Sequence, residues 1–137
     1  MRFVFKALRD GVKEPKRAHL NDAGYDVEMP DKVVLHPGKN VIPMGFSIIL
    51  PPGVCALLTP RSSWMGKLVN SAVPIDPGYS GEWHLCVNNL TGEDITIEQG
   101  ERIAQIVFLN YADADFVSEE EYRLNSRGEG GLGSTGK

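Results

Sequence analysis

Long apolar runs are missing from this sequence. No stretch approaches the ~20 residues that a membrane-spanning helix needs, and no basic-then-apolar leader opens the chain. We therefore expect a soluble, cytoplasmic protein that does not bind or span a membrane. Cysteine is scarce as well: Cys55 and Cys86 are the two examples, and they form no CxxC pair. Their spacing favours two buried, reduced thiols and excludes a disulfide framework.

An excess of positive charge is also missing. Lys and Arg number 14 against 18 Asp and Glu, which gives a net charge of −4. This balance argues against a large nucleic-acid-binding surface and predicts no nucleic-acid partner. It permits a small anionic substrate, because a phosphate site needs only local donors. His19, His36 and His84 have no paired spacing, so a zinc site is not indicated.

The chain has little helical periodicity and many turn residues. With 137 residues it fits one domain. The 15 glycines and 9 prolines suit the turns of an all-β chain better than a helical bundle. Short apolar runs alternate with turn signals about every ten residues, as in a sandwich, jelly roll or barrel. The predicted strands lie in residues 3–8, 33–35, 46–50, 54–58, 83–90, 95–97 and 102–109.

These patterns predict one all-β, jelly-roll-like β-barrel or sandwich domain over residues 1–126. One helix is suggested at 118–124, too short and too charged to organise a core. Residues 127–137 are so rich in glycine that we expect a flexible tail.

Two polar segments interrupt the first half of the strand pattern. In Asp22-Ala23-Gly24-Tyr25-Asp26, the glycine can let the backbone turn. The carboxylate of Asp26 can face hydrated Mg²⁺, which favours one or two carboxylates plus substrate phosphates. In 60–67, a proline followed by Ser62 and Ser63 suggests the start of a short helix that could bind an anion. The alternatives without a function are an ordinary loop for the first segment and a capped helical turn for the second.

A third segment, residues 70–82, predicts a hairpin lip that turns at Pro77-Gly78. Asp76 follows the apolar Ile75, so its carboxylate can be partly buried and suited to act as a base. Asn70 carries an amide that can match a pyrimidine edge, and Tyr79 can pack flat on a sugar. A turn capped by Asp76 with Tyr79 in the core is the alternative.

Two further segments end the chain. Gln105 falls inside the apolar strand of 102–109, where it needs a polar partner, either structural or a phosphate. In 127–137, glycines stand beside Arg127, Ser134 and Thr135. That composition is typical of a phosphate-cradling loop, although the P-loop spacing is missing.

In their order, these five segments resemble the motifs of the trimeric dUTPase family, and the resemblance spans Asp22 to Lys137. The matching pieces are Ala-Gly-Tyr-Asp, Pro-Arg-Ser-Ser, Ile-Asp-Pro-Gly-Tyr-Ser-Gly-Glu, Gly-Glu-Arg-Ile-Ala-Gln and Arg-Gly-Glu-Gly-Gly-Leu-Gly-Ser-Thr-Gly. The resemblance implies a jelly-roll subunit in a homotrimer with active sites at subunit boundaries. It also implies Mg²⁺-assisted hydrolysis of dUTP to dUMP and pyrophosphate.

Residue roles follow from the same resemblance. It implies that Asp76 activates water for attack on the α-phosphorus, and that Asp26 holds Mg²⁺ through waters. It further implies substrate-binding roles for Arg61, Ser62, Ser63, Asn70, Tyr79, Gln105, Arg127, Leu132, Ser134 and Thr135. Among these, Asn70 would read uracil, Tyr79 would lie under the deoxyribose, and the tail residues would close over the γ-phosphate.

The sequence departs from the family pattern at two places. Leu132 stands where an aromatic residue commonly stacks on uracil, which gives up a stacking interaction of about 1 kcal/mol. Val73 and Pro74 stand in the base-binding hairpin where the family commonly has a glycine. A stiff side chain and a missing N–H there predict a differently shaped uracil pocket.

Two alternatives share the fold. A dCTP deaminase has a similar Ile-Asp-Pro-Gly segment, but its catalytic glutamate would stand where this chain has Cys86. A non-catalytic regulatory protein is the other, although it would not need the five polar segments together. Ammonia release from dCTP and pyrophosphate release from dUTP distinguish these cases.

Overall fold

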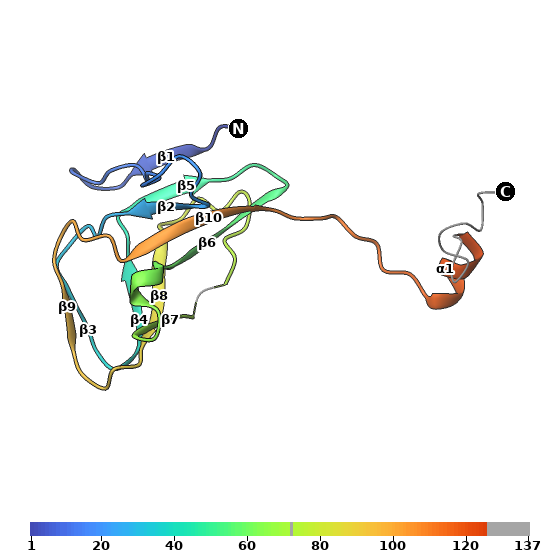
Figure 1. Cartoon of the computed structure of the whole chain (residues 1–137). Coiled ribbons are helices and arrows are strands. Elements are labelled where there is room, and N and C mark those ends of the chain that lie inside the picture. Colours follow the sequence, from blue (N-terminus) through green and yellow to red (C-terminus); the bar gives the residue numbers. More distant parts are fainter. Residues whose placement is uncertain (72, 126–137) are drawn as a thin grey trace.

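The structure is a computed structural model that describes residues 1–71 and 73–125. Its described part consists of short strands with one 3₁₀ helix (η1) and one α-helix, which confirms the predicted all-β class (Figure 1). The elements are β1 (Val4–Ala7), β2 (Gly24–Val27), β3 (Val33–Leu35), β4 (Gly38–Pro43), β5 (Phe46–Ile49), β6 (Val54–Pro60), η1 (Ser62–Trp64), β7 (Leu68–Asn70), β8 (His84–Asn89), β9 (Ile95–Ile97), β10 (Ala104–Asn110) and α1 (Glu119–Asn125).

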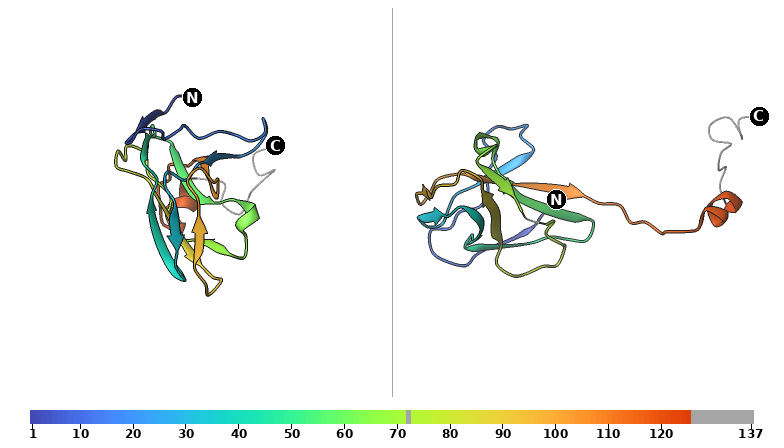
Figure 2. Two further views of the ribbon diagram at one scale, coloured as in Figure 1. Left: turned by 90° about the vertical axis from the view of Figure 1, so that its left-hand side faces the viewer. Right: turned by 90° about the horizontal axis from the view of Figure 1, so that it is seen from below.

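Antiparallel pairing joins these strands into four small sheets. Their orders are β1-β5, β2-β10-β6, β3-β9 and β4-β8-β7. Figure 1 and the right-hand view of Figure 2 show the strands gathered in one body, and the chain after β10 running away from it to α1.

The core lies between the sheets and follows the period of two expected for strands. In β6, Val54, Ala56 and Leu58 are buried, while the residues between them are half-buried. The same alternation buries the inward residues of β8 and the first residues of β10. Trp83 and Phe46 are the largest fully buried side chains, and their ring centroids are 5.8 Å apart.

Three strands, β2, β4 and β7, were not predicted, because their sequences are short or polar. β4 begins in the His-Pro-Gly segment that indicated only a turn, yet all six of its residues pair with β8. β7 pairs with the other side of β8 over three residues. β6 also continues through Thr59 and Pro60, which the sequence indicated as a turn. Proline is tolerated there because β6 lies at the edge of its sheet.

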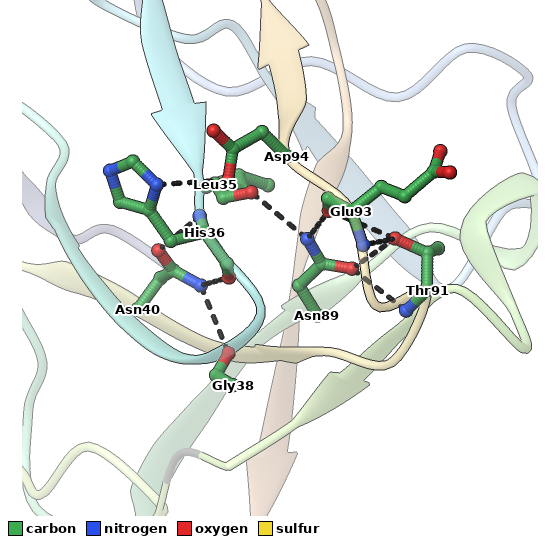
Figure 3. A network of polar contacts seen from close by, with 8 residues as sticks. All are labelled: Leu35, His36, Gly38, Asn40, Asn89, Thr91, Glu93 and Asp94. Carbon is green, nitrogen blue, oxygen red and sulfur yellow. Dashed lines mark hydrogen bonds and ion pairs between the residues drawn. The ribbon is translucent and has the colours of Figure 1, made fainter.

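A polar network closes the β3–β4 and β8–β9 connections (Figure 3). The buried Asn89 donates to the carbonyls of Leu35 (2.9 Å) and Glu93 (2.7 Å), and it accepts from the N–H and hydroxyl of Thr91. These bonds use the whole amide. The network therefore ties the end of β8 to the end of β3 and to the turn before β9.

The single described α-helix agrees closely with the sequence prediction. α1 begins one residue later than predicted, with the Ser118 hydroxyl accepting from the Glu121 N–H (3.1 Å), as in an N-cap. None of its residues is buried, so it contributes nothing to the core. Among the described residues, no helix combines the length and the apolar character needed to cross a membrane.

Candidate functional site

Asp76 and Tyr79 line one cavity of about 360 Å³, here called the Asp76 cavity. Its walls come from the end of β6, the loop after β7 and the start of β8. The lining residues are Leu58, Ser71, Val73, Pro74, Ile75, Asp76, Tyr79, Glu82, Trp83, His84 and Cys86. Most of these side chains are apolar, and they stand beside polar ones such as Asp76 and Glu82, as in sites that hold an organic ring and a charged group together.

Backbone bonds at both ends hold the loop that carries Asp76. Ile75 exchanges two backbone hydrogen bonds with Ala56 of β6 (2.7 and 3.1 Å). The N–H of Gly78 donates to the Leu50 carbonyl (3.0 Å), and φ at this glycine is +79°, as the second central residue of a type II turn requires. The loop conformation is therefore set by the main chain rather than by the Asp76 side chain.

The Asp76 carboxylate is exposed, and the expectation that it is partly buried was wrong. The reason is the alternation of an extended chain: Ile75 turns toward the interior and is half-buried, so its neighbour turns outward. The exposed side chain is open to solvent, so a water molecule can lie against its carboxylate.

Tyr79 lies flat against the chain rather than in the core. Its hydroxyl donates to the Glu82 carbonyl (3.0 Å), and a Cβ at Gly81 would come within 2.4 Å of that hydroxyl oxygen. The motif glycine at 81 thus leaves room for the ring. The side chain remains 46% exposed, so one ring face is open to a ligand.

A second group of predicted residues lines a smaller depression, here called the Gln105 pocket. It is formed by the end of β6, η1, β7 and β10, and its lining residues are Thr59, Pro60, Arg61, Ser62, Met65, Leu68, Asn70 and Gln105. Of the predicted substrate-binding residues in 1–125, Ser63 alone is absent from both linings. Its segment forms three residues of 3₁₀ helix, shorter than the helix start that the sequence suggested.

Arg61 is anchored within this pocket. Its Nε lies 3.1 Å from Asp26 Oδ1, and its guanidinium donates to the Arg102 carbonyl (3.0 Å). Asp26 is buried and its Oδ2 has no hydrogen-bond partner among the described residues, with Arg102 at 3.9 Å. A carboxylate with one oxygen bound and one oxygen free therefore stands beside the pocket.

The free oxygen suits a water-mediated metal contact. The described residues contain no cluster of three or more His, Cys, Asp or Glu side chains that could hold a metal ion. Mg²⁺ does not need such a cluster, because it keeps several waters and takes one or two carboxylates plus phosphate oxygens. The orphaned Oδ2 of Asp26 could accept from one of those waters, so the residues fit the ion in this outer role.

Gly24 serves a different purpose from the one expected. It lies inside β2 rather than at a turn, and it is not among the glycines with positive φ. A Cβ built on it would meet Gln105 Oε1 at 1.9 Å and Cδ at 2.8 Å. The missing side chain therefore makes room for the Gln105 amide, which lies across β2.

The two pockets are separated along β6 rather than by its two faces. Ile75 bridges Ala56, so Asp76 stands beside Cys55, and the two residues line a shared depression. Gln105 pairs with Thr59, four residues further along the same strand and on the same face as Cys55. At about 3.3 Å per residue, the described part of one chain therefore keeps Asp76 roughly 13 Å from Gln105.

Several cavity residues were not found from the sequence. Leu58, Trp83 and His84 lie in strands or at their ends and showed no chemical pattern of their own. Cys55 and Cys86 were expected to be buried thiols, but both are half-buried and free, and Cys86 lies at the cavity wall. Val73 is 75% exposed at the cavity rim. The predicted tail residues Arg127, Leu132, Ser134 and Thr135 lie outside the described residues.

Known proteins resemble this chain over nearly its whole length. A family model described as dUTPase matches residues 10–136. The deoxyuridine 5'-triphosphate nucleotidohydrolase of Nocardia farcinica is 38% identical over 137 residues, covering 96% of this chain and 83% of the relative. That of Corynebacterium glutamicum is 40% identical over 129 residues, covering 90% and 87%.

Solved structures agree. The dUTPase of Staphylococcus bacteriophage 80alpha with dUpNHpp superposes with a TM-score of 0.75 at 32% identity, covering 99% of both chains. A mutant dUTPase from phage phi11 of S. aureus, which coordinates a structural Mg(II) ion, gives 0.73 at 26% identity over 86% of this chain and 96% of that one. The fold, the ordered motifs and these matches together show that the chain belongs to the dUTPase family.

Proposed function

We propose that this protein is a dUTP diphosphatase that hydrolyses dUTP to dUMP and pyrophosphate. The observation that carries the proposal is the Asp76 cavity, where an exposed carboxylate and an open tyrosine face line the same apolar-walled space. The names of the relatives and the dUpNHpp-bound phage enzyme support dUTP as the substrate.

In the proposed reaction Asp76 is the general base. Its carboxylate accepts a proton from a water molecule while the water oxygen forms a bond to the α-phosphorus. The bond from that phosphorus to the oxygen bridging to the β-phosphate breaks, and pyrophosphate leaves with the electron pair. General-base assistance of this kind contributes about 10²–10⁴-fold.

The nucleoside would occupy the Asp76 cavity. The exposed face of Tyr79 would support the deoxyribose, where a ribose 2′-hydroxyl has no room. The base would lie among Leu58, Pro74 and Trp83, with Val73 at the rim. The apolar walls would exclude water from the ring.

The triphosphate would bind to the Gln105 pocket. Ser62 offers a hydroxyl, Gln105 an amide, and Arg61 a guanidinium already held in place by Asp26. A bound Mg²⁺ would offset the negative charge of the phosphates, with Asp26 holding it through water. Asn70 lies in the same pocket, so its amide would also face the nucleotide there.

We propose a homotrimer, because in a single chain Asp76 stands beside Cys55 and Gln105 beside Thr59, roughly 13 Å apart along β6. A neighbour would bring its Gln105 pocket to the Asp76 cavity, and the tail would close over the γ-phosphate through Arg127, Ser134 and Thr135, with Leu132 over the base. Exposed or half-buried Leu57, Val107 and Leu109 on the outer face of β6 and β10 support such a contact. Sedimentation equilibrium that gave a monomer at micromolar concentration would contradict it.

The decisive test is pyrophosphate release from dUTP, measured with and without Mg²⁺, in parallel with ammonia release from dCTP. We expect Mg²⁺-stimulated pyrophosphate release and no ammonia. Ammonia release would favour a deaminase. Absence of both products, with retained nucleotide binding, would favour a non-catalytic regulatory protein.

A further inference from the structure

A row of four paired residues crosses the sheet that carries Asp26. Lys16 forms an antiparallel bridge with Asp26, with backbone N–H···O distances of 3.0 and 2.7 Å in the two directions. Asp26 in turn pairs with Gln105 of β10, and Gln105 pairs with Thr59 of β6. Directly opposed residues of antiparallel strands point to the same face. The four side chains therefore share one face of the sheet.

This is the face of the Gln105 pocket, since both Thr59 and Gln105 line it. The neighbouring residue, Arg17, behaves as alternation requires: its guanidinium lies 4.6 Å from the ring centroid of Tyr25, on the other face of β2. The loop therefore sends one cation to each side of the sheet, and Lys16 is the one on the pocket side.

The Lys16 ammonium forms no ion pair within the described part of the chain. Its side chain is exposed, and none of the ion pairs among residues 1–71 and 73–125 includes it. The neighbouring carboxylate, Asp26, is instead paired with Arg61 at 3.1 Å and has Arg102 at 3.9 Å. A local excess of cations thus surrounds one carboxylate, in a protein whose net charge is −4.

The reach of the side chain matches the distance. Neighbouring strands are about 4.8 Å apart, so the Cα atoms of Lys16 and Gln105 are separated by roughly 10 Å. An extended lysine places its ammonium about 6 Å from Cα, and the remaining gap lies within the Debye length of about 8 Å at physiological salt. The Lys16 ammonium can therefore attract, through its charge, any polyanion held by Gln105 and Arg61.

We propose that Lys16 is a further substrate-binding residue, which binds the terminal phosphates of the nucleotide from the open edge of the sheet. This rests on the proposed function, and it adds a contact from a loop that carries none of the predicted site residues. Lys16 would strengthen binding of a triphosphate and leave binding of the nucleoside monophosphate and the chemical step unchanged.

The test is binding of dUpNHpp and of dUMP, measured by calorimetry on the full chain. Lys16→Gln removes the positive charge at residue 16, and Lys16→Arg keeps it. The control, Lys39→Gln, removes the charge of an exposed lysine in β4, next to Asn40 of the network in Figure 3. For Lys16→Gln we expect a Kd for dUpNHpp about three- to tenfold higher at 50 mM salt, a smaller difference at 300 mM, and an unchanged Kd for dUMP. Lys16→Arg and Lys39→Gln should match the wild type.

Steady-state kinetics should show the same split: KM for dUTP rises in Lys16→Gln and kcat stays within twofold. Unchanged binding of dUpNHpp by Lys16→Gln, an equal loss in Lys39→Gln, or an equal loss of dUMP binding would overturn the assignment while leaving the proposed function intact. A wild-type protein that neither binds nor hydrolyses dUTP would instead overturn the proposed function and this inference with it.

Discussion

The contact between Gly24 and Gln105 allows the phosphate role of Gln105 to be tested without changing Gln105 itself. In Gly24→Ala, the added Cβ would overlap Gln105 Oε1 at 1.9 Å and Cδ at 2.8 Å. Both atoms belong to the far end of a flexible side chain, so the amide can swing away. The nearest stiff atom, Gln105 Cβ at 3.3 Å, requires only a small shift.

The two expected effects differ in size. Alanine in a strand interior recovers about 0.5–1 kcal/mol relative to glycine, which partly offsets the displacement, so we expect Tm to change by less than about 5 °C. A hydrogen bond to a charged phosphate contributes about 1.5–3 kcal/mol, so kcat/KM for dUTP should fall by about 10- to 150-fold. Gly24→Ala should therefore lower kcat/KM strongly while changing Tm only slightly.

A double-mutant cycle with Gln105→Ala gives the assay its control. If the Cβ acts by displacing the amide, Gly24→Ala should cost nothing more in the Gln105→Ala background. A further tenfold loss there would show that the added methyl disturbs something else, such as the Asp26–Arg61 pair. A single variant with wild-type kcat/KM would refute the role of Gln105 in substrate binding.

Four other outcomes are expected. Asp76→Asn should reduce kcat by 10²–10⁴-fold with nearly unchanged dUpNHpp binding, and a variant that keeps more than about a third of wild-type kcat would show that Asp76 is not the base. Removal of residues 127–137 should sharply lower kcat/KM while Tm and oligomeric state stay as in the full chain; unchanged kinetics would reject a closing tail. Leu132→Phe should raise kcat/KM for dUTP by about fivefold through added stacking, and a loss that Val73→Gly does not restore would show that Leu132 does not cover the base. Asn89→Ala should lower the unfolding free energy by about 2–4 kcal/mol, measured by urea denaturation, because buried carbonyls lose their donors; activity per folded molecule should not change.

The strands that could be predicted are those whose residues are buried on one side. Val33–Leu35 and Ile95–Ile97 match the sequence prediction residue for residue. β4 could not be found this way, because its pairing with β8 leaves most of its side chains exposed and its sequence contains glycine, lysine and proline. A strand defined by its backbone partner, rather than by its buried side chains, leaves no periodic pattern in the sequence.

The role of Gly24 shows a second limit. Glycine in Asp-Ala-Gly-Tyr-Asp indicates a turn by composition, since glycine is the residue of positive φ. The actual constraint comes from a residue 81 positions later, whose amide occupies the space of the missing Cβ. Only the register of β2 against β10, in which Asp26 stands opposite Gln105, brings the two segments together.

The separation of the candidate site into two pockets follows from strand geometry. The sequence predicted Asn70 as part of a loop, so nothing separated it from Asp76 and Tyr79 six and nine residues later. In the structure Asn70 ends β7, which pairs with β8, and strand geometry then turns it away from Ser71. Asp76 stands beside Cys55 and Gln105 beside Thr59, so the two side chains lie on one face of β6 but are separated by four residues of the strand, roughly 13 Å. That separation exceeds the reach of the side chains, and the proposed trimer would remove it by bringing the Gln105 pocket of one copy to the Asp76 cavity of the next.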